Sequence, residues 1–561
     1  MRENPSVLLD DLLNLRLQFG AEAASRKLSL LLRLDRIRLP SGDAVSRLHE
    51  MLCFMRAYPD NAELLDRVRR ALDRFEGRRD FRRFRLHLAD TGIAGTDTHL
   101  TFFWPTARWI ANRWPESLAV DWKAFDGAHR LEEILHLLAT YPESPAIDEF
   151  AMPIKEWIAT LRAAGESDGS FLVRRFEALP ADSFLRETLY DSLGLAMTLR
   201  PGADTPSRTR AGIAVPSIAF QSGPLPSGRP SLRRVIRRLQ PRIRLVAPAD
   251  AERYIELARV AMVTRARDLD AFANADMNDV RLIEFDGGLQ FACMGVIPER
   301  RLMLESVYGC LTLKNGVPVG YVLLSSLFGS AEIAYNVFET WRGAEAAPVF
   351  ARVVALARHV FGATTFSIDP YQLGYHGNTE GLKSGAWWFY YKMGFRPRNR
   401  EVKRVLRDEL NAMKRNPRHR SDRRTLERLA SDSVYFELEN QGGVALGSLS
   451  PGNVGLGIVR LLAERHGADR ERSLRECARE AGELLGVRSQ AGWSAGEKLW
   501  WTRWSPLVLC LPEIESWSAT DKKRLVGVIR AKGARRESDY VRRFDAHERL
   551  RNALLEMAQP D

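Results

Sequence analysis

The stretch WFYYKMGFRP, which runs from Trp388 to Pro397, is the part of the sequence that says most about the fold. It ends a predicted helix, about Leu382–Met393, and the glycine at position 394 is the residue type favoured just past a helix end. Bulky aromatic residues in such a helix are typical of packing against a core. We therefore expect core or interface positions for Trp387, Trp388, Phe389 and Tyr391.

A tight hairpin is predicted upstream of this stretch. Two runs rich in β-forming residues, Val307–Leu313 and Val317–Leu324, are joined by Lys314-Asn315-Gly316. Asn-Gly readily supplies the positive φ angles that a two-residue hairpin turn needs. The chain should therefore reverse direction here within one sheet.

Strand and helix patterns alternate on either side of the hairpin. An opening strand, Arg242–Ala247, leads into a helix that starts near Pro248. After the hairpin, strands are predicted at Ala331–Phe338 and Thr364–Ile368, with an amphipathic helix at Glu345–Phe361 between them. This region is therefore of the mixed α/β (α+β) class.

The order of elements in residues 242–402 resembles that of the GNAT superfamily of acyl-CoA-dependent N-acyltransferases, and WFYYKMGFRP is similar to that family's closing FYxKLGF helix and turn. The resemblance implies a mixed-sheet GNAT-like domain that uses acetyl-CoA or another acyl-CoA as cosubstrate. It also implies acetyl or acyl transfer to an amine, which could belong to a small molecule, a peptide or a protein. No metal site is predicted.

The loop between the strand and the helix is where the family holds the pyrophosphate of acyl-CoA. Backbone N–H groups at a helix start, with the positive end of the helix dipole, form an anion site. Glu345 departs from the family pattern because it stands where the middle glycine is expected, and its carboxylate would repel phosphate. Cofactor binding is then weakened or lost, or else Glu345 turns away as a helix-capping acid. The cofactor-binding residues that the resemblance implies are Val337, Arg342, Gly343, Ala344, Glu345, Ala346 and Ala347.

Catalytic residues are expected from the same resemblance. Tyr390, four positions before the glycine at 394, matches the tyrosine that protonates the departing CoA thiolate, and a phenol with a pKa near 10 carries that proton at neutral pH. Glu332 on the central strand is the candidate general base, and Glu339 is the second choice. Either acid could equally be a surface carboxylate.

The flanking regions read differently. Residues 1–200 and 415–561 carry mainly helical apolar spacing, and residues 201–241 form a linker rich in Pro, Gly and Arg. We therefore expect a GNAT-like domain at 242–402 between mainly α-helical N- and C-terminal regions of unknown role. A Gly-rich segment at 452–457 is weighed as a nucleotide-binding loop against a flexible loop that opens a helix, and the flexible loop is favoured because no Lys-Ser/Thr follows the glycines.

The chain is basic, with a formal net charge of +12. This favours anionic partners. A block of arginines without an acid is expected to be a solvated interdomain segment, with contact to nucleic acid or an anionic membrane as the alternative. The block comprises Arg233, Arg234, Arg237, Arg238, Arg242 and Arg244.

A cytoplasmic location is expected. The five cysteines are scattered and suggest neither a disulfide framework nor a metal knuckle. The N-terminus lacks the pattern of a signal peptide, and no apolar run is long enough to span a membrane.

Two functions stay open for the central region: an acyl-CoA-dependent N-acyltransferase, or a non-catalytic GNAT-like binding module.

Overall fold

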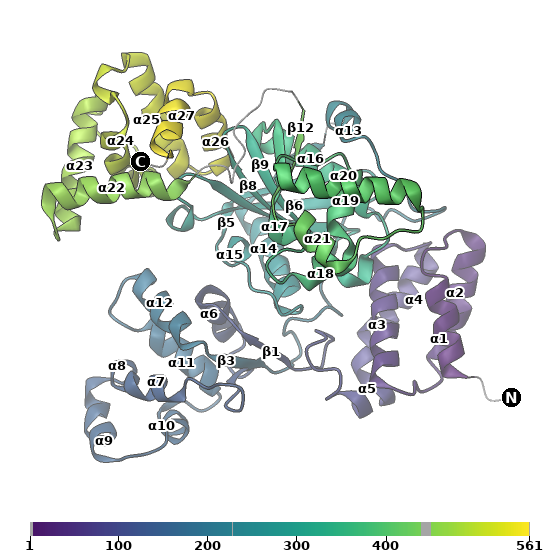
Figure 1. The fold of residues 1–561 in the computed structure, drawn as a ribbon. Helices are drawn as coiled ribbons and strands as arrows, with labels where there is room; N and C mark the ends of the chain where they lie inside the picture. The colour runs from purple at the N-terminus through teal and green to yellow at the C-terminus, as the bar shows by residue number, and fades with distance from the viewer. Residues whose placement is uncertain (1–3, 227, 240, 439–449, 560–561) are drawn as a thin grey trace. The chain divides into compact units, whose positions relative to one another are not determined.

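The computed structural model describes residues 4–226, 228–239, 241–438 and 450–559, which form two compact units. Unit 1 comprises Met1–Leu225, Glu252–Asn274 and Leu313–Val319, and unit 2 comprises Pro226–Ala251, Ala275–Thr312 and Gly320–Asp561. Helices and strands occur in both units, and the fold is of the mixed α/β class (Figure 1).

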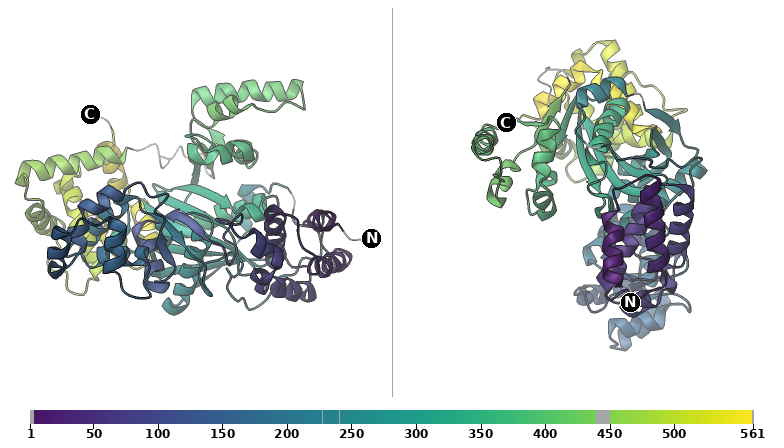
Figure 2. Two further views of the ribbon diagram at one scale, coloured as in Figure 1. Left: turned by 90° about the horizontal axis from the view of Figure 1, so that it is seen from below. Right: turned by 90° about the vertical axis from the view of Figure 1, so that its right-hand side faces the viewer.

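Unit 1 begins with a helical bundle whose four helices lie side by side (Figure 2). They are α1 (Pro5–Asn14), α2 (Ala21–Leu34), α3 (Gly42–Ala57) and α4 (Ala62–Asp73). Helix α4 shows why they pack, because its apolar residues Leu64, Leu65, Val68 and Leu72 recur at helical spacing and are all buried. The helical character expected for this region is confirmed.

A small sheet follows the bundle and was not predicted. Its antiparallel order is β1-β3-β2, formed by β1 (Thr98–Thr101), β2 (Leu118–Val120) and β3 (Ala196–Leu199). Strands of three or four residues are too short to show the alternation that identifies a strand in sequence. The helices around it are α5 (Arg79–Phe84), α6 (Trp104–Arg113), α7 (Ala128–Glu133), α8 (Leu135–Leu138), α9 (Ser144–Glu149), α10 (Ile154–Leu161), α11 (Asp168–Glu177) and α12 (Ser183–Leu193).

The first part of the expected 201–241 linker packs within unit 1. Thr205, Ser207 and Thr209 are buried. The guanidinium of Arg56 on α3 donates to the carbonyl oxygens of Thr209 at 2.6 Å and of Ala211 at 3.0 Å. Composition alone did not reveal this packing, because polar residues can satisfy their backbone through an arginine as well as through water. The arginine block begins further on, in α13 (Leu232–Arg238).

Unit 2 is built on a nine-stranded sheet with the order β11-β12-β10-β9-β8-β7-β6-β5-β4. The strands are β4 (Arg242–Leu245), β5 (Ala275–Phe285), β6 (Leu289–Val296), β7 (Ser306–Lys314), β8 (Val317–Leu327), β9 (Ser330–Val337), β10 (Thr365–Ile368), β11 (Arg396–Pro397) and β12 (Val434–Glu437). The tip of the β7–β8 hairpin, Leu313–Val319, is assigned to unit 1. The predicted Asn-Gly turn is confirmed, since Asn315 and Gly316 have φ angles of 50° and 76°.

Two features of this sheet differ from the sequence analysis. Strands β5 and β6 were missed, because both faces of these strands are largely buried and no polar alternation marks them. Strand β12 inserts between β10 and β11 and is antiparallel to both. The sheet therefore extends to residue 437, beyond the expected end at 402.

Helix α16 (Ala346–Phe361) connects the parallel strands β9 and β10 and covers one face of the sheet (Figure 1). Its Phe350, Val353 and Val354 share one core with Ile333 of β9 and Phe366 of β10. Opening strand β4 leads into α14 (Pro248–Val263) as predicted, and α15 (Asp270–Ala273) follows. Most of α14 and all of α15 belong to the Glu252–Asn274 part of unit 1.

The predicted helix Leu382–Met393 is two helices. Gly385 takes a left-handed φ of 66° and separates α18 (Thr379–Ser384) from α19 (Ala386–Lys392). The short helix α17 (Pro370–Leu373) precedes them. After β11, α20 (Arg400–Arg415) packs on α21 (Arg423–Leu429) (Figure 2).

The C-terminal part of unit 2 is helical, as expected. Its helices are α22 (Pro451–His466), α23 (Arg470–Leu485), α24 (Ala495–Cys510), α25 (Ala519–Gly533), α26 (Glu537–Asp545) and α27 (Glu548–Met557). The loop expected at 452–457 is wrong, both as a flexible segment and as a nucleotide-binding loop, because these residues lie inside α22 rather than before it. None of the helices in the described ranges has the length and apolar composition that a bilayer crossing requires.

Two of the five cysteines are paired, contrary to the sequence analysis. Cys293 of β6 and Cys310 of β7 form a disulfide, with Cα atoms 4.1 Å apart. The neighbouring positions of β6 and β7 in the sheet bring them together. Since β6 was not predicted, their proximity was not either.

Candidate active site

Strands β9 and β10 are neighbours in the sheet and pair over only a short length. They pair at only three positions, Thr365 with Ser330, Phe366 with Ala331 and Ser367 with Glu332. Strand β9 continues to Val337, whereas β10 ends at Ile368. The segment Ile333–Val337 therefore has no β10 residue beside it, and this edge of β9 offers backbone donors and acceptors to a ligand.

The segment after β9 leads to the start of α16. A 3₁₀ turn at Glu339–Trp341 is followed by Arg342, by Gly343 at a φ of 83° and by Glu345 as the helix N-cap. The first turn of α16 presents the N–H groups of Ala346 and Ala347, whereas Pro348 has none. The segment that was expected to hold a pyrophosphate is therefore a helix start in which Pro348 removes one of the backbone N–H donors.

Arg342 already has protein partners. Its guanidinium forms an ion pair with Glu380 of α18, and its Nε donates to the carbonyl of Val337 at 3.3 Å. The pair is half exposed and is therefore weak. A phosphate could compete with Glu380 for the guanidinium, which keeps its positive charge in proteins.

Glu345 is buried, with 7% of its surface exposed, and does not cap the helix through its side chain. It lies near Tyr335, whose hydroxyl donates to the carbonyl of Ala346 at 3.3 Å. Burial raises the pKa of Tyr335 well above its ordinary value, and the neighbouring Tyr390 and Glu345 add to the effect. The acid thus points into unit 2 and not to solvent.

Tyr390 lies in the aromatic core beneath α16. Its ring centroid is 5.3 Å from that of Phe350 and 5.9 Å from that of Phe395, and only 4% of its surface is exposed. Burial raises the pKa of Tyr390 above its ordinary value, so the phenol keeps its proton at neutral pH. The structure therefore brings Tyr390, Tyr335 and Glu345 together near the first turn of α16.

Tyr335 was missed by the sequence analysis. The sequence could have pointed to Tyr335, because it lies three residues after Glu332 on the same strand. Residues an odd number apart point to opposite faces of a sheet, so Tyr335 belongs to the face that Glu332 does not share. Its ring lies 5.4 Å from that of Phe350 on α16, so Tyr335 faces the helix. Glu332 accordingly belongs to the other face.

Glu332 belongs to an acidic cluster on that other face. Burial raises the pKa of Glu332 to about 7, and the charges of Asp369 and Glu305 contribute. The register partner of Glu332 on the neighbouring strand β8 is Ser325, whose hydroxyl donates to the Glu305 carboxylate at 2.9 Å. A carboxylate with a pKa near 7 can accept a proton at physiological pH.

Ser367 is the register partner of Glu332 on β10 and shares its face. It is fully buried, and within the described residues its hydroxyl has no hydrogen-bond partner. Glu339, the second-choice base, is exposed in the 3₁₀ turn. Glu332 is thus the stronger of the two candidates.

The described residues contain no group of three or more His, Cys, Asp or Glu side chains arranged to hold a metal ion. No protein-family model, no curated protein and no solved structure matches this chain, so the function has to be argued from these residues.

Proposed function

We propose that unit 2 contains an acyl-CoA-dependent N-acyltransferase of the GNAT type, which transfers an acyl group to an amine. The observation that carries the proposal is the divergence of β9 and β10 after three paired positions, with the start of α16 at the end of the open segment. The amide-containing arm of acyl-CoA that carries the thioester would lie along this edge of β9, because the unpaired backbone of Ile333–Val337 can hydrogen-bond to its amides.

The positions of the candidate residues define the chemistry. Glu332 and Tyr390 belong to opposite faces of the sheet, since Tyr390 packs with Phe350 and Tyr335 on the α16 face. The acyl group would lie in the opening between β9 and β10, with the amine on the Glu332 face and the thiol on the Tyr390 face. Each residue would then serve one proton transfer.

The reaction balances with these two residues. The amine nitrogen attacks the thioester carbonyl carbon, the new C–N bond forms and the C–S bond breaks. Glu332 takes the proton that the amine loses, and Tyr390 gives a proton to the departing thiolate. The pKa of about 7 suits Glu332 for the first step, and burial keeps Tyr390 protonated for the second.

A second candidate is a non-catalytic GNAT-like module, and buried Glu345 favours it. A carboxylate at the start of α16 is stabilised by the helix dipole and repels a pyrophosphate at the same place. Pro348 and the Arg342–Glu380 pair also reduce what the segment offers to phosphate. In this case side chains of the protein itself, and not a bound phosphate, interact with the charged and polar groups at the start of α16.

The two candidates are separated by incubating the full chain with acetyl-CoA and a panel of amines, and measuring release of free CoA thiol. The panel should contain small amines, peptides and lysine-rich proteins, because the acceptor class is open. Release that depends on an amine supports the enzyme. The binding module predicts no release with any acceptor.

A further inference from the structure

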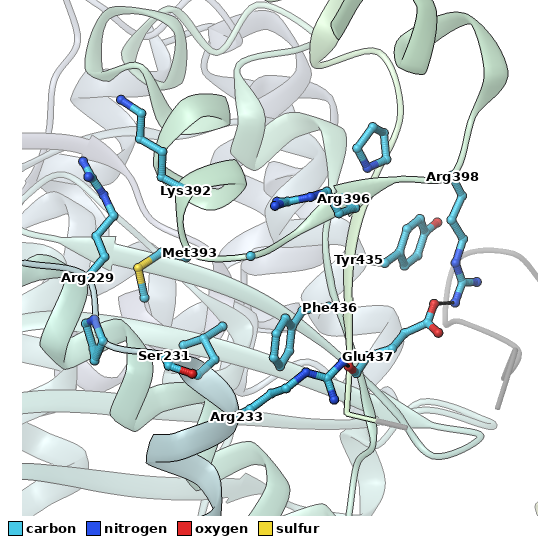
Figure 3. A pocket seen from close by; sticks show the side chains of 14 residues that line it. Arg229, Ser231, Arg233, Lys392, Met393, Arg396, Arg398, Tyr435, Phe436 and Glu437 are labelled. Atoms are coloured by element: carbon cyan, nitrogen blue, oxygen red, sulfur yellow. Dashed lines mark hydrogen bonds and ion pairs between the residues drawn. The ribbon is translucent and has the colours of Figure 1, made fainter. Parts of the chain in front are cut away.

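A basic surface pocket of unit 2 is lined by none of the candidate catalytic or acyl-CoA-binding residues. It has a volume of about 560 Å³ and is formed by residues 229–233, 392–394, 396–398 and 435–437, from the start of α13, the turn after α19, and strands β11 and β12 (Figure 3). Five of its side chains are cationic and one is a carboxylate. The cations are Arg229, Arg233, Lys392, Arg396 and Arg398.

Two of the arginines are held by main-chain carbonyl groups. Arg396 donates to the carbonyl oxygens of Tyr391 and Phe395, both at 2.7 Å, and lies over the Tyr391 ring. Arg233 donates to the carbonyl of Glu437 at 2.6 Å and to that of Leu438. Neutral carbonyls orient a guanidinium without cancelling its charge, and a guanidinium has five N–H donors, so some are left for a ligand.

The single carboxylate of the pocket does not neutralise the other cations. Glu437 pairs with Arg398 at 2.5 Å, as the dashed line in Figure 3 marks. In the described part of the chain, neither Arg229 nor Lys392 has an ion-pair partner, and both are exposed. Like charges gathered around one pocket repel each other, and an anion bound between them removes that cost.

We propose that this pocket binds the phosphates of a small polyanionic ligand, a diphosphate or triphosphate group. Arginine forks match phosphate oxygens in geometry, and several cations held together favour a ligand with more than one negative charge. The volume lies within the range of about 300–1,000 Å³ that is usual for small-molecule sites. Oriented arginines also lose little freedom on binding, which favours affinity.

The pocket does not belong to the proposed acyl-CoA site. None of the residues 342–347 lines it, and neither does Tyr335, Tyr390 or Glu332. The arginine block of the sequence contributes only Arg233, at the start of α13. The inference therefore stands whether or not the chain is an acyltransferase.

The test is calorimetric titration of the full chain with inorganic pyrophosphate, ATP and orthophosphate. We expect pyrophosphate and ATP to bind, and to bind more tightly than orthophosphate. An Arg229→Ala/Lys392→Ala double variant should lose about tenfold or more in pyrophosphate affinity, since each removed residue donates to a charged group. Both residues are exposed, so the variant should fold, as circular dichroism would verify.

The matched control is Lys403→Ala, which removes an exposed cation of α20 outside the pocket and should leave the affinity unchanged. Tighter binding of ATP than of pyrophosphate would assign the ligand to the nucleotides, and equal binding would assign recognition to the phosphates alone. The proposal is overturned if pyrophosphate does not bind, or if the double variant binds it as well as the control. It is also overturned if only a single-stranded oligonucleotide or phosphatidylserine vesicles bind.

Discussion

Glu332 and Ser367 stand opposite each other at the last paired position of β9 and β10, where the two strands part. The Ser367 hydroxyl is buried and has no partner among the described residues, and the pKa of Glu332 is raised to about 7. A buried donor and a poised carboxylate at the end of a strand pairing are costly to maintain for stability alone. The relationship makes Glu332 the most informative residue to change.

Glu332→Gln should abolish the pH dependence of acyl transfer. If Glu332 is the base, kcat/KM of the unmodified chain rises with pH and levels off above about pH 7, because only the ionised carboxylate accepts a proton. The glutamine variant should be slower by about 100-fold or more and show no such rise. Glu339→Gln, which removes the exposed acid, should keep the full profile.

The same substitution should change how stability depends on pH. Because folding raises the pKa of Glu332 from 4.5 to about 7, the protonated carboxyl favours the folded state. That contribution is complete below pH 4.5 and is lost as the pH rises through about 7. Thermal unfolding should therefore show Glu332→Gln to be more stable than the unmodified chain at pH 8, with a smaller difference at pH 5. A constant difference would show that the carboxyl is not perturbed.

Lys532→Met should destabilise unit 2. The Lys532 ammonium and the Glu537 carboxylate are both fully buried and lie 2.5 Å apart. Removing the lysine leaves the buried carboxylate with only the more distant Arg301 guanidinium, at 3.9 Å, as an ion-pair partner. The expected loss is about 3 kcal/mol or more, measured as a lower melting temperature. The double variant Lys532→Met/Glu537→Gln should recover much of the lost stability. The control Lys403→Met, which changes an exposed side chain of α20, should have little effect. No recovery would contradict the pairing.

Tyr390→Phe should slow turnover more than it weakens CoA binding. The substitution keeps the ring contacts with Phe350 and Phe395 and removes only the hydroxyl, so folding should be preserved. Tyr335→Phe is the matched control, because Tyr335 donates to a backbone carbonyl beside the same helix start. An equal effect of both variants on the rate would assign the loss to structure and not to proton donation.

Much of the sheet was predictable from sequence, and the reasons are local. The Asn315-Gly316 turn, the amphipathic helix α16 and the glycine at 394 each carry a signal within a few residues. Strands β5 and β6 carry none, because charged residues interrupt the first half of β5 and β6 is apolar on both faces. The insertion of β12 between β10 and β11 depends on pairings far apart in the chain, which no local pattern encodes.

The candidate site was predictable in part. Tyr390 and the 342–347 segment were proposed from motif positions and Glu332 from its place on the predicted strand Ala331–Phe338, but the burial of Glu345 could not be predicted from its neighbours in sequence. Tyr335 lies in the same strand as Glu332 and was overlooked because no motif marks it. Its role follows from the face of β9 that α16 covers, which is a tertiary property.

The most direct test of the account is calorimetric titration with CoA of the full chain carrying Arg229→Ala/Lys392→Ala, which disables the basic pocket, alongside the same chain with Glu345→Gly. If the start of α16 holds the pyrophosphate, CoA should bind with one site per chain, and removing the buried carboxylate should tighten that binding by about tenfold, as expected for lost charge repulsion at a helix start. If neither protein binds CoA at about 1 mM, a concentration at which even weak specific sites fill, the acyltransferase proposal is contradicted.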